Sequence, residues 1–89
     1  MIAVYYNPVA MTETQYRDVL ARVRALGIEF SGIKHHSCFG EGQQLAVYEI
    51  WESKAAWDAF GSHLMPILDE AGITLSRPPD AMPVVEFQQ

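Results

Sequence analysis

Apolar and polar residues follow two different periods along the chain, and these periods predict strands and helices. Residues 2–6 are β-branched or aromatic and stop at an Asn-Pro turn, which predicts a first strand. Residues 33–39 and 45–51 are also strand-like, and the two glycines of the loop at residues 40–42 predict that they form an antiparallel hairpin. Residues 84–87 read Val-Val-Glu-Phe, follow a loop with three prolines and predict a short final strand.

Apolar residues at helical spacing predict two helices between these strands. Thr12 is the expected N-cap of the first helix, and Ser53 is the expected N-cap of the second. Pro66 lies inside the second pattern and removes a backbone donor there, so we expect a kink or a break between Gly61 and Pro66. The apolar positions are Tyr16, Val19, Leu20, Val23 and Leu26 in the first helix, and Trp57, Phe60, Leu64, Leu68 and Ala71 in the second.

The order of the elements is strand, helix, strand, strand, helix, strand. This order is that of the split βαβ, ferredoxin-like arrangement. Right-handed crossovers place both helices on one face of a four-stranded antiparallel sheet, with the first and third strands in the centre. The chain has 89 residues, which is the length of one small domain. We therefore predict a single α+β ferredoxin-like domain over residues 1–89.

The face of the sheet without helices is also expected to be apolar. On the first strand, Ala3 and Tyr5 alternate with other apolar residues, so neither face of this strand is polar. A second copy of the chain is the simplest cover, which predicts a homodimer whose two sheets pack face to face as a dimeric α+β barrel. Since a carboxylate is better tolerated at a partly wet interface, Glu49 predicts which row of the third strand faces the partner. This row is Leu45, Val47, Glu49 and Trp51.

Composition excludes several classes of function. The net charge is −5 and the six basic residues are scattered, which argues against nucleic acid as a partner. The longest wholly apolar run is residues 1–6, too short to span a bilayer, so no membrane partner is expected. Cys38 is the single cysteine and no Cys/His set spells a metal site, so neither a disulfide nor a metal is expected. A free thiol without an export signal predicts a cytoplasmic protein.

The junction between the third strand and the second helix resembles a known family. Residues 51–60 read Trp-Glu-Ser-Lys-Ala-Ala-Trp-Asp-Ala-Phe and are followed by Leu64 and Pro66. This pattern is similar to the dimeric α+β barrel superfamily, particularly its small antibiotic-biosynthesis-monooxygenase-like proteins, over almost the whole chain in length and element order. The resemblance implies a pocket between helices and sheet in each protomer, and an oxygenase that acts on phenolic compounds without a cofactor.

Another branch of the superfamily degrades haem. There, an asparagine at the end of the first strand works with a tryptophan and a histidine of the second helix. Asn7 stands at the asparagine position of this sequence. Phe60 stands at the tryptophan position and Glu70 near the histidine position, while His63 lies nearly two turns too early. Two of the three matches fail, so the resemblance implies no haem, and we expect no cofactor.

Four residues are candidates for catalysis. His35 and His36 are adjacent on a predicted strand, so their side chains face opposite sides and cannot share a metal. The histidine that faces the pocket is the candidate base for deprotonating a phenol or enol, although a hydrogen-bonded structural histidine is the alternative. Asn7 and Tyr48 are the candidates for holding an oxyanion, with an ordinary Asn-Pro turn as the alternative for Asn7. We expect the Tyr48 hydroxyl to point into the space under the helices.

Four further residues are candidates for ligand contacts: Tyr5, Trp57, Phe60 and His63. Aromatic side chains suit a flat apolar ligand, but the same residues also suit a filled core, and His63 also suits the surface. The sequence therefore predicts a small-molecule-binding homodimer that acts as a cofactor-independent monooxygenase on an aromatic or phenolic substrate. The alternative is a non-catalytic ligand-binding or structural homodimer. A structural dimer needs a filled core, whereas the monooxygenase needs a cavity with a histidine in its wall.

Overall fold

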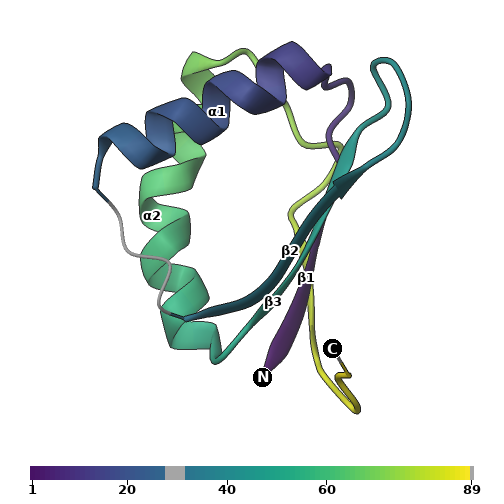
Figure 1. The fold of residues 1–89 in the computed structure, drawn as a ribbon, viewed down its shortest axis with the longest axis vertical. Helices are drawn as coiled ribbons and strands as arrows, with labels where there is room; N and C mark the ends of the chain where they lie inside the picture. The colour runs from purple at the N-terminus through teal and green to yellow at the C-terminus, as the bar shows by residue number, and fades with distance from the viewer. Residues whose placement is uncertain (28–31, 89) are drawn as a thin grey trace.

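In the computed structural model, which describes residues 1–27 and 32–88, two helices cover one face of an antiparallel sheet (Figure 1). The sheet has four strands in the order β2-β3-β1-β4, so β1 and β3 are central as predicted. The ferredoxin-like fold class is therefore confirmed. The elements are β1 (Ile2–Tyr6), α1 (Glu13–Ala25), β2 (Ile33–Phe39), β3 (Ala46–Trp51), α2 (Lys54–Glu70) and β4 (Asp80–Pro83).

Both helices begin at the predicted caps. The Gln15 backbone N–H donates to the Thr12 hydroxyl over 3.2 Å, and the Thr12 backbone N–H donates to the Gln15 side chain over 2.9 Å. These two bonds form a capping box, which satisfies donors that the first turn leaves free. At the start of α2, the Ala56 backbone N–H donates to the Ser53 hydroxyl over 3.1 Å. The caps fix where each helix enters the layer above the sheet.

Of the kink or break predicted in α2, a break is wrong, because this helix runs without interruption from Lys54 to Glu70. Pro66 cannot donate a backbone hydrogen bond to the carbonyl of Ser62, four residues earlier. Both residues are exposed, so water can take the place of the missing donor. The helix therefore continues past the proline and places its apolar face along the sheet.

The predicted position of the last strand is also wrong. We expected residues 84–87 to form it and residues 76–83 to be a loop. The observed β4 is Asp80–Pro83, which pairs with β1 at the edge of the sheet. Residues 84–87 follow β4 without forming a strand.

The antiparallel hydrogen-bond pattern explains how β4 tolerates its proline. Pro83 stands opposite Ile2, and the next pair along is joined by the Val84 N–H, which donates to the Met1 carbonyl over 3.1 Å. Hydrogen-bonded and non-hydrogen-bonded pairs alternate along such strands. Pro83 therefore occupies a position that needs no donor, and an edge strand can contain it.

The core lies between the helices and one face of the sheet. Val4 and Trp51 are its most deeply buried large side chains, and the Trp51 ring packs on Phe60 with centroids 5.1 Å apart. The buried core residues are Val4, Tyr6, Met11, Val19, Val23, Val47, Trp51, Phe60, Leu64, Ile67, Leu68 and Ile73. Val47, Glu49 and Trp51 thus face the helices, and the prediction that their row faces a partner subunit is wrong. The opposite row of β3, with Tyr48, belongs to the uncovered face.

The hairpin loop provides a stability test. Gly40 has φ +124°, and a Cβ there would lie 2.3 Å from the carbonyl oxygen of Gln44. Gly40→Ala is therefore expected to lower the free energy of unfolding by about 3 kcal/mol. Gly42→Ala is the matched control: φ is +58° with no atom within 4 Å of the new Cβ, and the expected cost is about 1 kcal/mol. Urea denaturation measures both, and equal losses would contradict the close approach at Gly40.

Candidate functional site

A cavity of about 310 Å³ lies between the helix layer and the sheet. Both helices and the strands β1, β2 and β3 contribute side chains to its wall, and the segments between these elements contribute Pro8, Met11, Ile73 and Leu75. The apolar lining includes Met11, Val19, Val23, Phe60, Leu64 and Leu68. Among the residues that the structure describes, the polar lining consists of Tyr6, Tyr16, Arg24, His36 and Glu49. A space of this kind holds a mostly apolar molecule that presents one polar end.

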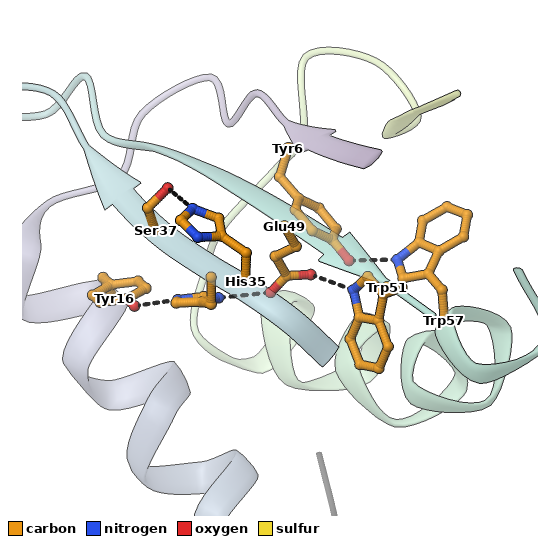
Figure 2. A network of polar contacts seen from close by, with 8 residues as sticks. Tyr6, Tyr16, His35, Ser37, Glu49, Trp51 and Trp57 are labelled. Atoms are coloured by element: carbon orange, nitrogen blue, oxygen red, sulfur yellow. Dashed lines mark hydrogen bonds and ion pairs between the residues drawn. The ribbon is translucent and has the colours of Figure 1, made fainter. Parts of the chain in front are cut away.

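Three polar residues of the wall, Tyr16, His36 and Glu49, are joined by hydrogen bonds (Figure 2). The Tyr16 hydroxyl of α1 lies 2.6 Å from His36 Nε2 on β2. His36 Nδ1 lies 2.7 Å from Glu49 Oε2 on β3. The second oxygen of Glu49, Oε1, accepts a hydrogen bond of 2.9 Å from the indole N–H of Trp51. A continuous chain therefore runs from the α1 side of the cavity into the core.

The chemistry of its members assigns the direction of this chain. An ionised carboxylate only accepts hydrogen bonds, so Nδ1 of His36 carries a hydrogen atom and its N–H donates a hydrogen bond to Glu49. In the neutral imidazole, Nε2 is then the acceptor, and the Tyr16 hydroxyl donates to it. His36 therefore presents its proton-accepting nitrogen toward the cavity side, with a carboxylate behind it. The same order of groups orients histidine bases in enzymes that remove a proton from a hydroxyl.

Glu49 is a buried carboxylate, with 4% of its surface exposed. We expected burial under the helices to be too costly, but two donors offset the loss of water. Trp51 donates to one oxygen and His36 to the other. A buried charge with hydrogen bonds to both oxygens is far cheaper than an isolated one. The register of the hairpin provides this arrangement, since His36 stands opposite Glu49.

Tyr6 occupies the other side of Glu49. Its hydroxyl accepts a hydrogen bond of 2.7 Å from the indole N–H of Trp57. Burial, and next the negative charge of Glu49, raise the pKa of Tyr6 well above its ordinary value. Tyr6 therefore stays a neutral hydroxyl in the folded protein.

This shift predicts a loss of stability in alkali. Below the ordinary tyrosine pKa both states carry the proton, and above it the unfolded chain ionises Tyr6 first. The free energy of unfolding should therefore fall as the pH rises above about 10. In Tyr6→Phe this contribution is absent, so its stability should fall less steeply with pH. Chemical denaturation at several alkaline pH values measures both slopes, and parallel curves would contradict the shift.

The single cysteine lies on the same face of β2 as His36. Burial is the largest cause of the raised pKa of Cys38, so the thiol form is favoured over the reactive thiolate. Burial also raises the pKa of Tyr16.

Among the residues that the structure describes, no group of three His, Cys, Asp or Glu side chains could hold a metal ion.

The structure separates the two adjacent histidines. His36 lines the cavity, whereas His35 packs edge-on against Tyr48, with ring centroids 5.9 Å apart, on the uncovered face of the sheet. Figure 2 shows His35 beside Ser37, to which it is bonded over 3.2 Å, apart from the chain through Glu49. The expectation that Tyr48 points under the helices is wrong. Tyr5 is paired with Tyr48 across the strands and shares its face.

The other candidate residues have different surroundings. Phe60 lines the cavity. Trp57 is not part of the described wall, but its indole N–H donates a hydrogen bond to the hydroxyl of Tyr6, which does line the cavity. His63 is exposed on α2, and the carbonyl of Asn7 accepts hydrogen bonds from the backbone N–H and the hydroxyl of Ser76, over 2.9 and 2.8 Å. Neither His63 nor Asn7 is part of the described wall of the cavity.

Four polar residues of the cavity wall are not among the site candidates predicted from the sequence: Tyr6, Tyr16, Arg24 and Glu49. The sequence does contain a signal that places Glu49 in the site. Glu49 lies on the same face of β3 as Val47 and Trp51, and the register of the hairpin pairs it with His36. Tyr16 was identified only as an apolar helix residue. Nothing in its local sequence indicates a contact with a strand twenty residues away.

Comparison with known proteins identifies the fold. No family model matches the chain, and no curated protein is significantly similar to it in sequence. Among solved structures, SnoaB, a cofactor-independent oxygenase from Streptomyces nogalater, is similar with a TM-score of 0.71 and 12% identity over 97% of this chain and 94% of that one. A protein of unknown function from Nitrosomonas europaea, NE2512, has a TM-score of 0.64 and 20% identity, covering 99% and 92% of the two chains.

A third similar structure is Rv0793 from Mycobacterium tuberculosis, with a TM-score of 0.62 and 17% identity over 99% of this chain and 96% of that one. The likeness to these three structures extends over nearly the full length of each chain. The chain therefore shares its fold with them, and this likeness supports the resemblance that the residues around Trp51 indicated.

Within the described residues, neither α1 nor α2 has the length and apolar character that a membrane span requires.

Proposed function

We propose that the protein binds a flat phenolic or similar aromatic molecule in the cavity between helices and sheet and oxygenates it with O₂ without a cofactor. One observation carries the proposal: a mostly apolar cavity contains the proton-accepting side of a Glu49–His36 pair. An apolar wall favours an aromatic body, and a single basic nitrogen favours a ligand with one acidic hydroxyl. The size of about 310 Å³ suits a small ring system.

The chemistry needs only the substrate and oxygen. Removal of the phenolic proton by the Glu49–His36 pair leaves an electron-rich phenolate that can transfer electrons to O₂. One oxygen atom is then added to the ring, the other leaves as water, and the substrate becomes a quinone. The carboxylate of Glu49 stabilises the protonated His36 that this step creates. The likeness to SnoaB, a cofactor-independent oxygenase, supports this class of reaction.

A cavity with a histidine in its wall favours ligand binding over a purely structural role. Binding without catalysis is the second candidate, because the cavity alone supports it. A thermal-shift panel of phenols, quinols, fatty acids and haem at fixed protein concentration tests binding. Oxygen uptake with the phenols that bind then tests catalysis. Stabilisation by phenols with oxygen uptake supports the oxygenase, and no stabilisation by any phenol contradicts it. Stabilisation by any member of the panel without oxygen uptake supports the binding protein, and no stabilisation by any member contradicts both candidates.

We further propose that the uncovered face of the sheet forms a homodimer. Tyr5 and Phe39 stack on this face with centroids 6.4 Å apart, and 51% of the Phe39 surface is exposed. Exposed aromatic surface of this kind is typical of a protein interface. The resemblance of residues 51–60 to the dimeric α+β barrel superfamily implies the same arrangement.

This proposal predicts the behaviour of a single variant. Tyr48 lies near the centre of the uncovered face, between Tyr5 on β1 and Ser37 on β2. Tyr48→Glu places a charge in the interface, so the dissociation constant of the dimer should rise at least about a hundredfold. Analytical ultracentrifugation measures this shift, with Glu86→Gln outside the sheet as a control. A Tyr48→Glu dimer as stable as the original would contradict the interface.

A further inference from the structure

The proton-accepting nitrogen of His36 is already occupied. The Tyr16 hydroxyl lies 2.6 Å from Nε2, and the two rings are inclined by only 14° with centroids 6.0 Å apart. The hydroxyl therefore meets the edge of the imidazole, where Nε2 has its lone pair. A neutral imidazole has one such acceptor position, because its other nitrogen carries the proton. While Tyr16 stays in place, a ligand hydroxyl has no free acceptor on His36.

Tyr16 itself remains open to a ligand. It lines the cavity from α1, and a hydroxyl that donates one hydrogen bond retains acceptor capacity for another. Its partner His36 is backed by Glu49 at 2.7 Å, so a positive charge on the imidazole would form beside a carboxylate. The three groups therefore form a relay from the cavity to a buried anion. In Figure 2, dashed lines join the labelled Tyr16 and Glu49 to the unlabelled imidazole between them, which the distances identify as His36.

We propose that Tyr16 is the catalytic group that contacts the ligand hydroxyl and relays its proton to His36. The ligand O–H bond breaks and a new O–H bond forms on Tyr16, while the original Tyr16 proton moves to Nε2. The ligand becomes a phenolate, His36 becomes an imidazolium, and no electrons are transferred. This inference rests on the proposed binding of a phenol in the cavity and adds the residue that receives its proton.

The surroundings of Tyr16 favour a relay over a stored charge. Burial raises the pKa of Tyr16, so a lasting tyrosinate is unfavourable there. In the relay the hydroxyl gains one proton as it loses another, so this ion never accumulates. The charged or titratable groups that influence Tyr16 are Arg17 and Arg24 on α1, Cys38 on β2 and Glu49 on β3, besides its partner His36.

The relay can be tested without oxygen, which separates it from the oxygenase reaction. The probe is 7-hydroxycoumarin, a flat bicyclic phenol whose neutral and ionised forms absorb at different wavelengths. Bound to the unaltered protein under anaerobic conditions, it should ionise at a pH lower than in water by about one unit, a tenfold change in the ionisation constant. Tyr16→Phe should abolish this shift. Tyr48→Phe, the same change on the uncovered face, should retain it.

Binding is measured in the same samples to separate the relay from a structural role. The probe 7-methoxycoumarin has no proton to transfer, so its dissociation constant should agree within about twofold between the original protein and Tyr16→Phe. The dissociation constant of 7-hydroxycoumarin should rise by up to about tenfold in Tyr16→Phe, which corresponds to one lost hydrogen bond. Circular dichroism and thermal melting confirm that each variant is folded.

Three results would overturn the inference in distinguishable ways. If Tyr16→Phe ionises the bound probe as fully as the original protein does, the ligand reaches His36 directly and Tyr16 is not the relay. If the original protein binds 7-hydroxycoumarin without shifting its ionisation, the relay is wrong while phenol binding stands. If the original protein binds neither coumarin, the proposed phenol site is contradicted, and the relay with it.

Discussion

Replacing His36 with glutamine is expected to lower the rate of phenol oxygenation by about 10²- to 10⁴-fold, the usual contribution of a positioned general base. His36 lies between the cavity and Glu49, with Nε2 as its accepting atom and Nδ1 fixed by the carboxylate. Glutamine can fill much of the same space but offers no basic nitrogen. The loss should therefore appear in kcat, because the cavity that binds the substrate changes little.

The neighbouring histidine offers a matched control for this variant. His35 is adjacent in sequence and faces the opposite side of the sheet, where it contacts Tyr48. His35→Gln makes the same chemical change outside the cavity, so its rate should stay within about threefold of the original. Oxygen uptake measured for both variants tests whether His36 is the base. Equal losses in the two variants would contradict the assignment of the base.

Truncating Glu49 to alanine is expected to lower the free energy of unfolding by about 3 kcal/mol, as for a broken buried polar network. Trp51 is 2% exposed, and its indole N–H would lose its acceptor without gaining water. His36 would lose the partner of Nδ1, and the removed side chain would leave a void. In a domain of this size, each kcal/mol lowers the melting temperature by about 4–8 °C.

Glutamine at the same position separates stability from catalysis. Glu49→Gln retains an oxygen that can accept from Trp51, so the expected cost is about 1 kcal/mol. The neutral amide cannot stabilise an imidazolium, so oxygenation should still fall at least about tenfold. Calorimetry at one fixed protein concentration, together with oxygen uptake, measures both effects. A Glu49→Ala protein as stable as the original would contradict the proposed network.

The element order was predictable because strong local signals agree with it. Thr12 and Ser53 mark the starts of the helices, and the alternating strands on either side of a glycine loop mark the hairpin. The predicted position of the last strand is wrong because that position depends on pairing with β1, which is distant in sequence. Residues 84–87 have the higher β propensity, but β1 pairs with Asp80–Pro83 instead.

The candidate site was predictable only in part, because its polar residues come from different elements. Glu49 was assigned to the wrong face on the cost of burying an unpaired carboxylate, whereas His36 and Trp51 pair with both of its oxygens. Because the row with Glu49 faces the helices, the alternate row with Tyr48 faces away from the cavity. The contact between Tyr16 and His36 joins a helix to an edge strand, and no local pattern encodes it.

The location of a bound phenol tests the central proposal most directly. Nuclear Overhauser contacts between 7-hydroxycoumarin and methyl-labelled protein would locate the ligand on one face of the sheet. Contacts are expected with methyl groups of the cavity wall, such as those of Val23, Leu64 and Leu68. Contacts confined to the uncovered face, at Ala46 or Met82, would contradict the cavity as the binding site.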